Sequence, residues 1–368
     1  MAKDPAQHGP YLTNLDQVQQ LKGADRTVLE KVAKRYAFRC NDYYLSLIDW
    51  NDPRDPIRRI VVPSVEELDK WGRLDPSDEK TYTVMPGLEH KYHSTALLLV
   101  SNVCEGICRY CFRKRVFIKP QSEYLRDVPA AIQYIREHPE ISNVLLTGGD
   151  PLVLPTSQLA DIVGQVRDID HVQIVRIGTR MPAFNPYRIT EDPALLAMFE
   201  QYSSPEKRMY VMTHFVHPRE LTDIAIEAVG RLQKAGAITA NQTPLIRGVN
   251  DDPEVLADLL AKLSFIGDVP YYIFQCRPAM GNSAYTVPIE EGYEIIEQAK
   301  ARVSGLAKRV RFTMSHATGK MEIIGKVAGQ VYFKYHRAAN DADSGRIMAF
   351  ASNPQACWFD DYEEVTGG

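Results

Sequence analysis

The strongest constraint on the fold is a pattern of short β-branched runs that alternate six times with longer amphipathic stretches. We expect strands near residues 97–103, 144–149, 172–178, 209–215, 238–246 and 271–276. Helical apolar spacing predicts helices near residues 129–139, 157–168, 192–203, 222–235, 253–266 and 289–304. Successive strand–helix units imply an α/β fold with a parallel sheet, which right-handed crossovers would curl into a partial (β/α)6 barrel.

The regions on either side of this core, residues 97–305, have different patterns. Residues 1–96 are rich in charge, proline and helix-like stretches, such as 25–36, and predict a mainly helical layer that caps the barrel. Residues 306–368 are irregular, with strands expected at 321–325 and 330–335, and predict an α+β extension. A length of 368 residues suggests roughly two domains, although one barrel can absorb most of such a chain.

Charge and hydropathy exclude several classes of partner. The chain has 43 Lys and Arg against 47 Asp and Glu, a net charge of −4, so charge does not favour nucleic acid or an anionic membrane. No apolar run approaches membrane-spanning length, and residues 1–8 lack the apolar core of a signal peptide. We expect a cytoplasmic protein with reduced thiols, in which the dispersed Cys40, Cys276 and Cys357 are buried.

Three of the six cysteines, Cys104, Cys108 and Cys111, follow the first expected strand with the spacing C-x3-C-x2-C. Three thiolates can hold three irons of a [4Fe–4S] cluster and leave the fourth iron open, as a catalytic cluster requires. On a helix the same spacing would place the thiols on one face as core residues. Zinc needs four ligands, and the nearest candidates, His90 and His93, lie upstream. We favour the cluster.

Unusual residues follow the other expected strands, and parallel strands bring their carboxyl ends to one rim, where the site of a barrel lies. Gly148, Gly149 and Asp150 could form an ordinary turn or a close approach to a ligand amine. His214 could be a core histidine or bind a cofactor, and Asn241 and Gln242 would be costly to bury unpaired. The other strand-end segments are 178–180, 213–215 and 275–277.

Lys320 follows a glycine and precedes an apolar run. It could be a surface lysine. Alternatively, burial could lower its pKa and make the amine nucleophilic, as the lysine that binds pyridoxal phosphate (PLP) must be.

The cysteine spacing resembles that of the radical S-adenosylmethionine (SAM) superfamily, and residues 10–340 resemble its lysine 2,3-aminomutase family. Matching segments are 43–49, 84–92, 145–152, 175–180, 213–218, 241–243, 247–250 and 270–276. The resemblance implies an isomerase of the aminomutase type with a [4Fe–4S] cluster, SAM and PLP. SAM would be cleaved reductively to a 5′-deoxyadenosyl radical that abstracts hydrogen from an amino-acid substrate.

The resemblance also implies roles for individual residues. Cys104, Cys108 and Cys111 would bind the cluster, and the motif Gly148, Gly149 and Asp150 would bind SAM, with His214 as a further cofactor contact. Lys320 would be the PLP lysine, while Lys91, Tyr92, Asn241 and Gln242 fall where the family holds PLP phosphate or SAM. Arg113 would hold the substrate carboxylate with its guanidinium fork, unless it is merely a surface charge.

Departures from the family concern the substrate. Lysine-specific members place an aspartate where this chain has Arg277, and another near the position of Ser315 and His316. A cation at the first position would disfavour an ammonium group and favour a distal carboxylate. We therefore predict an acidic substrate such as glutamate, bound by Arg113, Arg277, Ser315 and His316. Alternatively, Arg277 pairs with a neighbour such as Glu290.

Other departures leave further alternatives open. The family's zinc-binding cysteines are missing, so we expect no zinc, and Thr95 and Phe274 replace residues that help to hold PLP. A radical SAM tailoring enzyme or protein-lysine modifier is the main rival function, and a non-catalytic zinc-binding scaffold is another. An electron donor such as flavodoxin or ferredoxin is implied, and the protein is a possible homo-oligomer.

Overall fold

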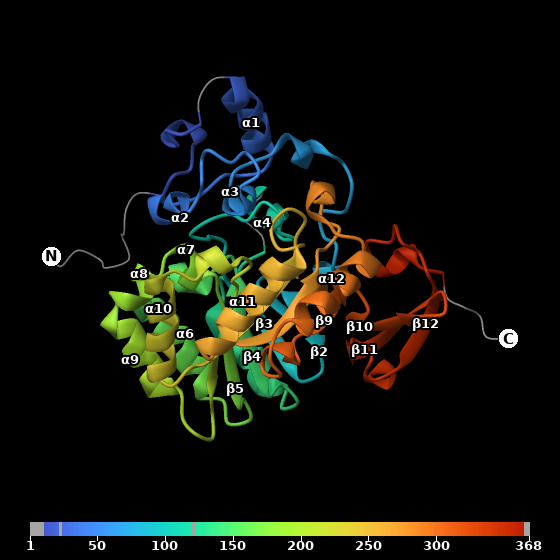
Figure 1. Ribbon diagram of the computed structural model, residues 1–368. Helices are drawn as coiled ribbons and strands as arrows, with labels where there is room; N and C mark the ends of the chain where they lie inside the picture. The colour runs from blue at the N-terminus through green and yellow to red at the C-terminus, as the bar shows by residue number, and fades with distance from the viewer. Residues whose placement is uncertain (1–10, 22–23, 119–122, 364–368) are drawn as a thin grey trace.

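The computed structural model describes residues 11–21, 24–118 and 123–363, and the amino-terminal segment 1–8 discussed above lies outside them. Its centre is a sheet of twelve strands in sequential order, with helices around it (Figure 1). The strands are β1 (Thr83–Met85), β2 (Leu88–Tyr92), β3 (Thr95–Ser101), β4 (Asn143–Gly148), β5 (Ile174–Gly178), β6 (Met209–Thr213), β7 (Ile238–Leu245), β8 (Val269–Gln275), β9 (Arg311–His316), β10 (Gly319–Val327), β11 (Gln330–Ala338) and β12 (Ile347–Ala351). No helix in the described ranges is both long and apolar enough to cross a bilayer.

Strands β3 to β9 pair in parallel, and the predicted α/β partial barrel is confirmed. The six expected strands are β3–β8, and β9 continues the parallel sheet beyond them. The six expected helices are α5 (Val128–Glu137), α6 (Thr156–Arg167), α9 (Pro193–Tyr202), α10 (Asp223–Lys234), α11 (Pro253–Phe265) and α12 (Ile289–Ala301). Short helices α4 (Lys114–Ile118), α7 (Met181–Phe184) and α8 (Tyr187–Thr190) lie in the loops at the carboxyl ends of β3 and β5.

Three barrel helices begin with the same local signal, an aspartate followed by proline in the first turn. The carboxylates of Asp127, Asp192 and Asp252 accept hydrogen bonds from backbone N–H groups of the first turn. Proline fits there because the first-turn N–H groups have no partner within the helix. These caps fix where each helix starts and therefore how long the preceding strand-end loop is.

The amino-terminal region contains α1 (Ala24–Arg35), α2 (Asp42–Ser46) and α3 (Pro56–Val61), but it also supplies β1 and β2. The description of this region as mainly helical therefore missed two strands, which pair antiparallel and join β3. The helices lie above the barrel in Figure 1. Their apolar residues, including Tyr44, Ile57 and Ile60, form one hydrophobic cluster with Tyr110, Phe184 and other residues of the strand-end loops. This layer covers the rim where the site was expected.

The carboxyl-terminal region extends the sheet with antiparallel strands β10–β12. A second hydrophobic core, which includes the aromatic residues Phe333, Phe350 and Trp358, packs these strands together with residues of α12. In the β9–β10 hairpin, Lys320 lies opposite Ser315. The hairpin thus attaches Lys320 directly to the last parallel strand of the barrel.

Candidate active site

A cavity of about 480 Å³ opens at the carboxyl ends of the parallel strands. It brings together most of the residues selected from the sequence, although they are far apart in the chain. Its walls include Cys104, Cys108, Cys111, Gly148, Gly149, Asp150, His214, Gln242, Lys91, Tyr92, Arg113, Arg277, Ser315 and Lys320. Asn241 and His316 do not line the cavity.

The two exceptions use their side chains within the fold. The Asn241 amide group donates to the backbone oxygen of Phe215, and its oxygen accepts from the Phe215 N–H at 2.8 Å. His316 contacts Asp360 and Thr318 through its two ring nitrogens. The sequence predicted binding because both are polar residues at strand ends. Their partners come from distant segments, which the local pattern does not reveal.

The three cysteines lie on an irregular loop after β3 rather than on a helix, so the core-helix alternative is wrong. The loop is fixed by Arg109, which donates two 2.8 Å hydrogen bonds to the buried carboxylate of Glu67. In the part of the chain that is described, no three His, Cys, Asp or Glu side chains gather around one ion position. A [4Fe–4S] cluster does not need three ligands around one ion position, because each thiolate binds a different iron. His90, the zinc alternative, instead contacts the Tyr134 hydroxyl and the His93 carbonyl.

Gly148 and Gly149 press against the end of β3. Gly148 has a φ of +117°, and a Cβ at Gly149 would lie 2.2 Å from the Val103 carbonyl oxygen. The Asp150 carboxylate accepts from the Thr179 hydroxyl and from the Arg180 N–H. The fold therefore requires this turn for its own packing, and the turn also forms part of the cavity wall.

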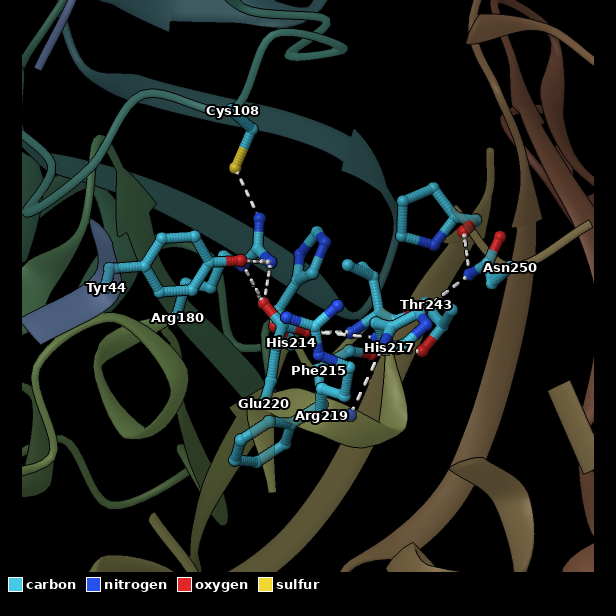
Figure 2. A network of polar contacts seen from close by, with 12 residues as sticks. Tyr44, Cys108, Arg180, His214, Phe215, His217, Arg219, Glu220, Thr243 and Asn250 are labelled. Carbon is cyan, nitrogen blue, oxygen red and sulfur yellow. Dashed lines mark hydrogen bonds and ion pairs between the residues drawn. The ribbon is translucent and has the colours of Figure 1, made fainter. Parts of the chain in front are cut away.

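Beside the cysteine loop, Arg180 and its partners form a buried polar network (Figure 2). Arg180 contacts the Cys108 thiol and the carboxylate of Glu220. His214 lies 3.3 Å from the Tyr110 hydroxyl, and burial together with the Arg180 charge holds the pKa of His214 well below its usual value. His214 is therefore neutral at pH 7. The sequence placed Arg180 at a strand end but gave it no role, and Glu220 carried no signal.

Lys320 is a buried amine in a cationic environment. Burial, followed by the charges of Arg176, Arg277, Arg337 and Lys91, lowers the pKa of Lys320 well below its usual value. The amine lies 4.1 Å from the centre of the Tyr272 ring, and no described carboxylate forms an ion pair with it. A lowered pKa raises the fraction of the amine that is unprotonated and nucleophilic, as the interpretation of Lys320 as a PLP lysine requires.

Arg113 is engaged by a residue that sequence reasoning missed, Glu79. The Nε and Nη2 atoms of Arg113 donate to the Glu79 carboxylate at 3.1 and 2.8 Å, and Nη1 donates to the Thr147 hydroxyl at 3.3 Å. Burial alone would raise the pKa of Glu79, but Arg113, Arg115 and Arg277 lower it to about 2. Arg113 is thus buried and paired, and the surface-charge alternative is wrong.

Arg277 has a different environment. Its guanidinium packs over Phe112 at 3.6 Å from the ring centre, and Nη1 is 4.0 Å from Glu79, beyond hydrogen-bond range. Nη1 is buried without a hydrogen-bond partner among the described residues. Burial, together with the positive charge of Arg113, lowers the pKa of Arg277 to about 10. Glu290 instead accepts from Ser352 and Asn353, so the proposed Arg277–Glu290 pair is not formed.

These residues fit the cofactors that the sequence suggested. Arg176, Arg337 and Lys91 line the cavity around Lys320, and an anionic group such as a phosphate would relieve their mutual repulsion. The buried Thr95 hydroxyl in the same wall has no hydrogen-bond partner in the described structure. The substitutions at Thr95 and Phe274 therefore leave a cavity that still suits a phosphate-bearing aromatic cofactor.

Known proteins with similar sequences support the same conclusion. Residues 98–260 match the Radical SAM superfamily. The chain is 53% identical to a protein of Aquifex aeolicus named "Putative L-lysine 2,3-aminomutase", over 96% of this chain and 95% of that protein. It is 41% identical to the L-lysine 2,3-aminomutase of Clostridium subterminale, over 72% of this chain and 62% of that enzyme. It is 35% identical to the glutamate 2,3-aminomutase of Clostridioides difficile, over 80% of this chain and 68% of that enzyme.

These matches confirm the expected family and enzyme class and exclude the non-catalytic scaffold. They imply a [4Fe–4S] cluster, SAM and PLP as cofactors, and a small amino acid as the kind of substrate. The cavity geometry and the sequence relationships agree: this chain belongs to the lysine 2,3-aminomutase family of radical SAM enzymes.

Proposed function

We propose that the protein is a PLP-dependent 2,3-aminomutase that converts a free acidic α-amino acid, such as glutamate, into a β-amino acid. The observation that carries this proposal is Arg277, a largely buried guanidinium in the cavity wall whose Nη1 lacks a hydrogen-bond partner in the described structure. A buried donor without a partner is costly, and a substrate carboxylate would satisfy it. The ammonium group of lysine would add a further cation to a region that already holds several.

The charges around Arg277 favour an anion even though Glu79 is close. Arg113, Arg115 and Arg277 surround Glu79, so cations outnumber this carboxylate. The second carboxyl group, Glu89, has its pKa raised to about 7 by burial and by Glu79, so it is only partly ionised at neutral pH. Arg115 also pairs with Asp75 and Glu123, so its charge is compensated. The charge that a second substrate carboxylate would compensate is that of Arg277, whose Nη1 forms no hydrogen bond with a described carboxylate.

Individual residues take the following roles in this proposal. Cys104, Cys108 and Cys111 bind the cluster, while Gly148, Gly149, Asp150 and His214 form the wall that receives SAM. Lys320 would bind PLP, and Lys91, Tyr92, Gln242, Arg176 and Arg337, which line the same cavity, would hold the PLP phosphate or SAM. Arg277 and Ser315 bind the distal carboxylate. Arg113 holds the α-carboxylate through its Nη1 edge, since Glu79 occupies the other edge.

When bound, the reduced cluster and SAM supply a 5′-deoxyadenosyl radical that takes hydrogen from the substrate, and PLP supplies the carrier for the migrating amino group. The residues of this chain fix the two ends of the substrate and exclude water, which protects a radical and sets its distance to the substrate. The amino-terminal layer assists by covering the rim. An electron donor such as flavodoxin or ferredoxin, and possible association as a homo-oligomer, are further parts of this proposal that rest on the family resemblance.

An amino-acid panel tests the substrate. Anaerobically reconstituted protein with PLP, SAM and dithionite is incubated with glutamate, aspartate, lysine, glutamine and alanine, and β-amino acids are quantified by mass spectrometry. We expect glutamate or aspartate to be converted at least tenfold faster than lysine, because a buried like-charge contact costs several kcal/mol. Rapid turnover of lysine with glutamate untouched would overturn the substrate assignment. Cleavage of SAM without any β-amino acid would favour the rival tailoring function.

Variants at Arg277 sharpen this test. Arg277→Asp should lower the rate with the acidic substrate and raise the lysine rate relative to it, since it exchanges the sign of the charge. Arg277→Lys keeps the charge but loses the fork, and should retain part of the activity. Arg302→Lys, an exposed arginine at the end of α12, serves as the matched control and should change neither rate.

A further inference from the structure

Arg180 places a permanent positive charge on a cysteine of the cluster loop. The residue follows β5, and its Nη1 atom lies 2.7 Å from the Cys108 sulfur and 2.7 Å from the Tyr110 hydroxyl. The side chain is 6% exposed, and a guanidinium keeps its proton at any physiological pH. The thiol contact is therefore a charge-assisted one in a dry environment.

Three elements hold this guanidinium in one orientation (Figure 2). Nε donates to the His214 backbone oxygen at 3.1 Å, and Nη2 contacts the fully buried Glu220 carboxylate. Glu220 also accepts a 2.5 Å hydrogen bond from the Tyr44 hydroxyl on α2 and a 2.6 Å one from the Val216 N–H. The guanidinium further lies 4.3 Å from the centre of the Phe184 ring.

A fixed charge at this position matters because reduction adds one electron to the cluster. The potential of an iron–sulfur cluster depends on its net charge, on hydrogen bonds to its sulfurs and on solvent exposure. A donor cation stabilises the more negative, reduced state, and burial strengthens the effect. The Glu220 anion, held on the far side of the guanidinium, acts in the opposite direction and moderates it.

We propose that Arg180 is a positioning residue that raises the reduction potential of the cluster through Cys108, and that Glu220 sets the size of this effect. The proposal rests on the cluster ligation by Cys108 proposed above. It concerns the one-electron couple between the oxidised and reduced cluster, with dithionite as the electron source in the test. It requires neither PLP nor an amino-acid substrate.

The experiment is a redox titration of the reconstituted full chain, without SAM or substrate, followed by electron paramagnetic resonance. Arg180→Gln should shift the midpoint potential to a more negative value, because it removes the cation. Arg180→Lys keeps a charge without the fork and should shift it less. Glu220→Gln should shift the midpoint in the positive direction, because the guanidinium charge is then uncompensated. Midpoint shifts of opposite sign in Arg180→Gln and Glu220→Gln distinguish this electrostatic role from a general loosening of the loop. A loosened loop would shift the midpoint of both variants in the same direction.

Two further variants serve as controls. Tyr44→Phe removes a hydroxyl from Glu220 but no charge, and should give the smallest shift within the network. Arg231→Gln removes an exposed arginine of α10 that pairs with Glu227, and should give none. Iron and sulfide are quantified in every variant.

An unchanged midpoint in Arg180→Gln protein with a complete cluster would overturn the proposal. Loss of iron from Arg180→Gln protein, together with an unchanged midpoint potential in Glu220→Gln protein, would also overturn the proposal. Arg180 would then have a purely structural role. By contrast, a wild-type protein that assembles no cluster would refute the ligation itself and not the role of Arg180. The two failures are therefore distinguishable.

Discussion

At the scale of single residues, the site is defined by cations that the fold buries without enough carboxylates. Lys320 and Arg277 both lose solvent, and their pKa values fall because burial and neighbouring cations disfavour the charged form. Buried cations of this kind lower the stability of the folded protein when no ligand is bound. Residues of this kind therefore mark where an anionic cofactor or substrate has to bind.

The lowered pKa of Lys320 predicts that Lys320→Met stabilises the protein in the absence of PLP. The unfolded chain holds the Lys320 proton more tightly than the folded chain, so folding releases a proton at any pH between the two pKa values, and this release costs free energy. As pH rises from the folded pKa towards the ordinary value of about 10.4, wild-type stability should gain up to about 1.4 kcal/mol per pH unit relative to the variant. Urea unfolding between pH 6.5 and 9.5 measures this.

The control for this experiment is Lys326→Met on the same strand. Lys326 pairs with Glu294, which raises the pKa of Lys326. Replacement of Lys326 should therefore not increase the free energy of unfolding. The prediction would be contradicted if wild type and Lys320→Met protein were equally stable at pH 7 and the difference between their free energies of unfolding did not change with pH.

At the scale of elements, the cysteine loop depends on the amino-terminal layer more than on its own sequence. Arg109, between Cys108 and Cys111, and Lys114, after Cys111, both bind Glu67 from the segment after α3. The Asn282 amide group, from the segment after β8, also donates to the Tyr110 carbonyl. The loop is too short and irregular to hold three thiols in place alone, so contacts from distant elements fix its shape.

Glu67→Gln should therefore destabilise the protein and impair cluster assembly. The change removes the anion from a buried pair and leaves Arg109 uncompensated, which typically costs about 3 kcal/mol or more. Urea unfolding and iron content after anaerobic reconstitution measure the two effects. Glu66→Gln, the exposed neighbour, is the matched control and should stay within about 0.5 kcal/mol of wild type. Full iron uptake by Glu67→Gln protein would show that the loop does not need this contact.

At the scale of the whole molecule, charge is distributed unevenly. The chain carries a net charge of −4, yet the cavity wall near Lys320 contains Arg176, Arg277, Arg337 and Lys91. Overall charge therefore says little about what binds, because the local field in a buried cavity decides it. The arrangement favours anions inside a protein that is anionic outside.

PLP should accordingly raise the thermal midpoint of the protein. At a concentration 100 times the dissociation constant, binding to the folded state alone adds about 2.7 kcal/mol, which corresponds to a midpoint shift of several degrees. Arg337→Gln should reduce the shift, since it removes one of the cavity cations, whereas Arg231→Gln should not. Differential scanning fluorimetry with and without PLP measures this, and an unaltered midpoint in wild-type protein at saturating PLP would contradict PLP binding.

The sequence by itself determined the barrel and most of the cavity. Strand and helix periods are local properties, and in a parallel sheet all strands end at the same rim, so residues such as Cys104, Gly148 and His214 had to converge there. The sequence also identified Lys320, although it lies 209 positions after Cys111 in the chain. The β9–β10 hairpin that brings it to the rim became visible only in the structure.

Only the tertiary structure decided how the side chains pair. Glu67, Glu79 and Glu220 stand in segments without any motif, yet they bind Arg109, Arg113 and Arg180. Asn241 and His316 looked like ligands but bond within the fold. Pairing depends on which side chains meet after the amino-terminal layer closes over the barrel, and such contacts between distant segments leave no periodic trace in the sequence.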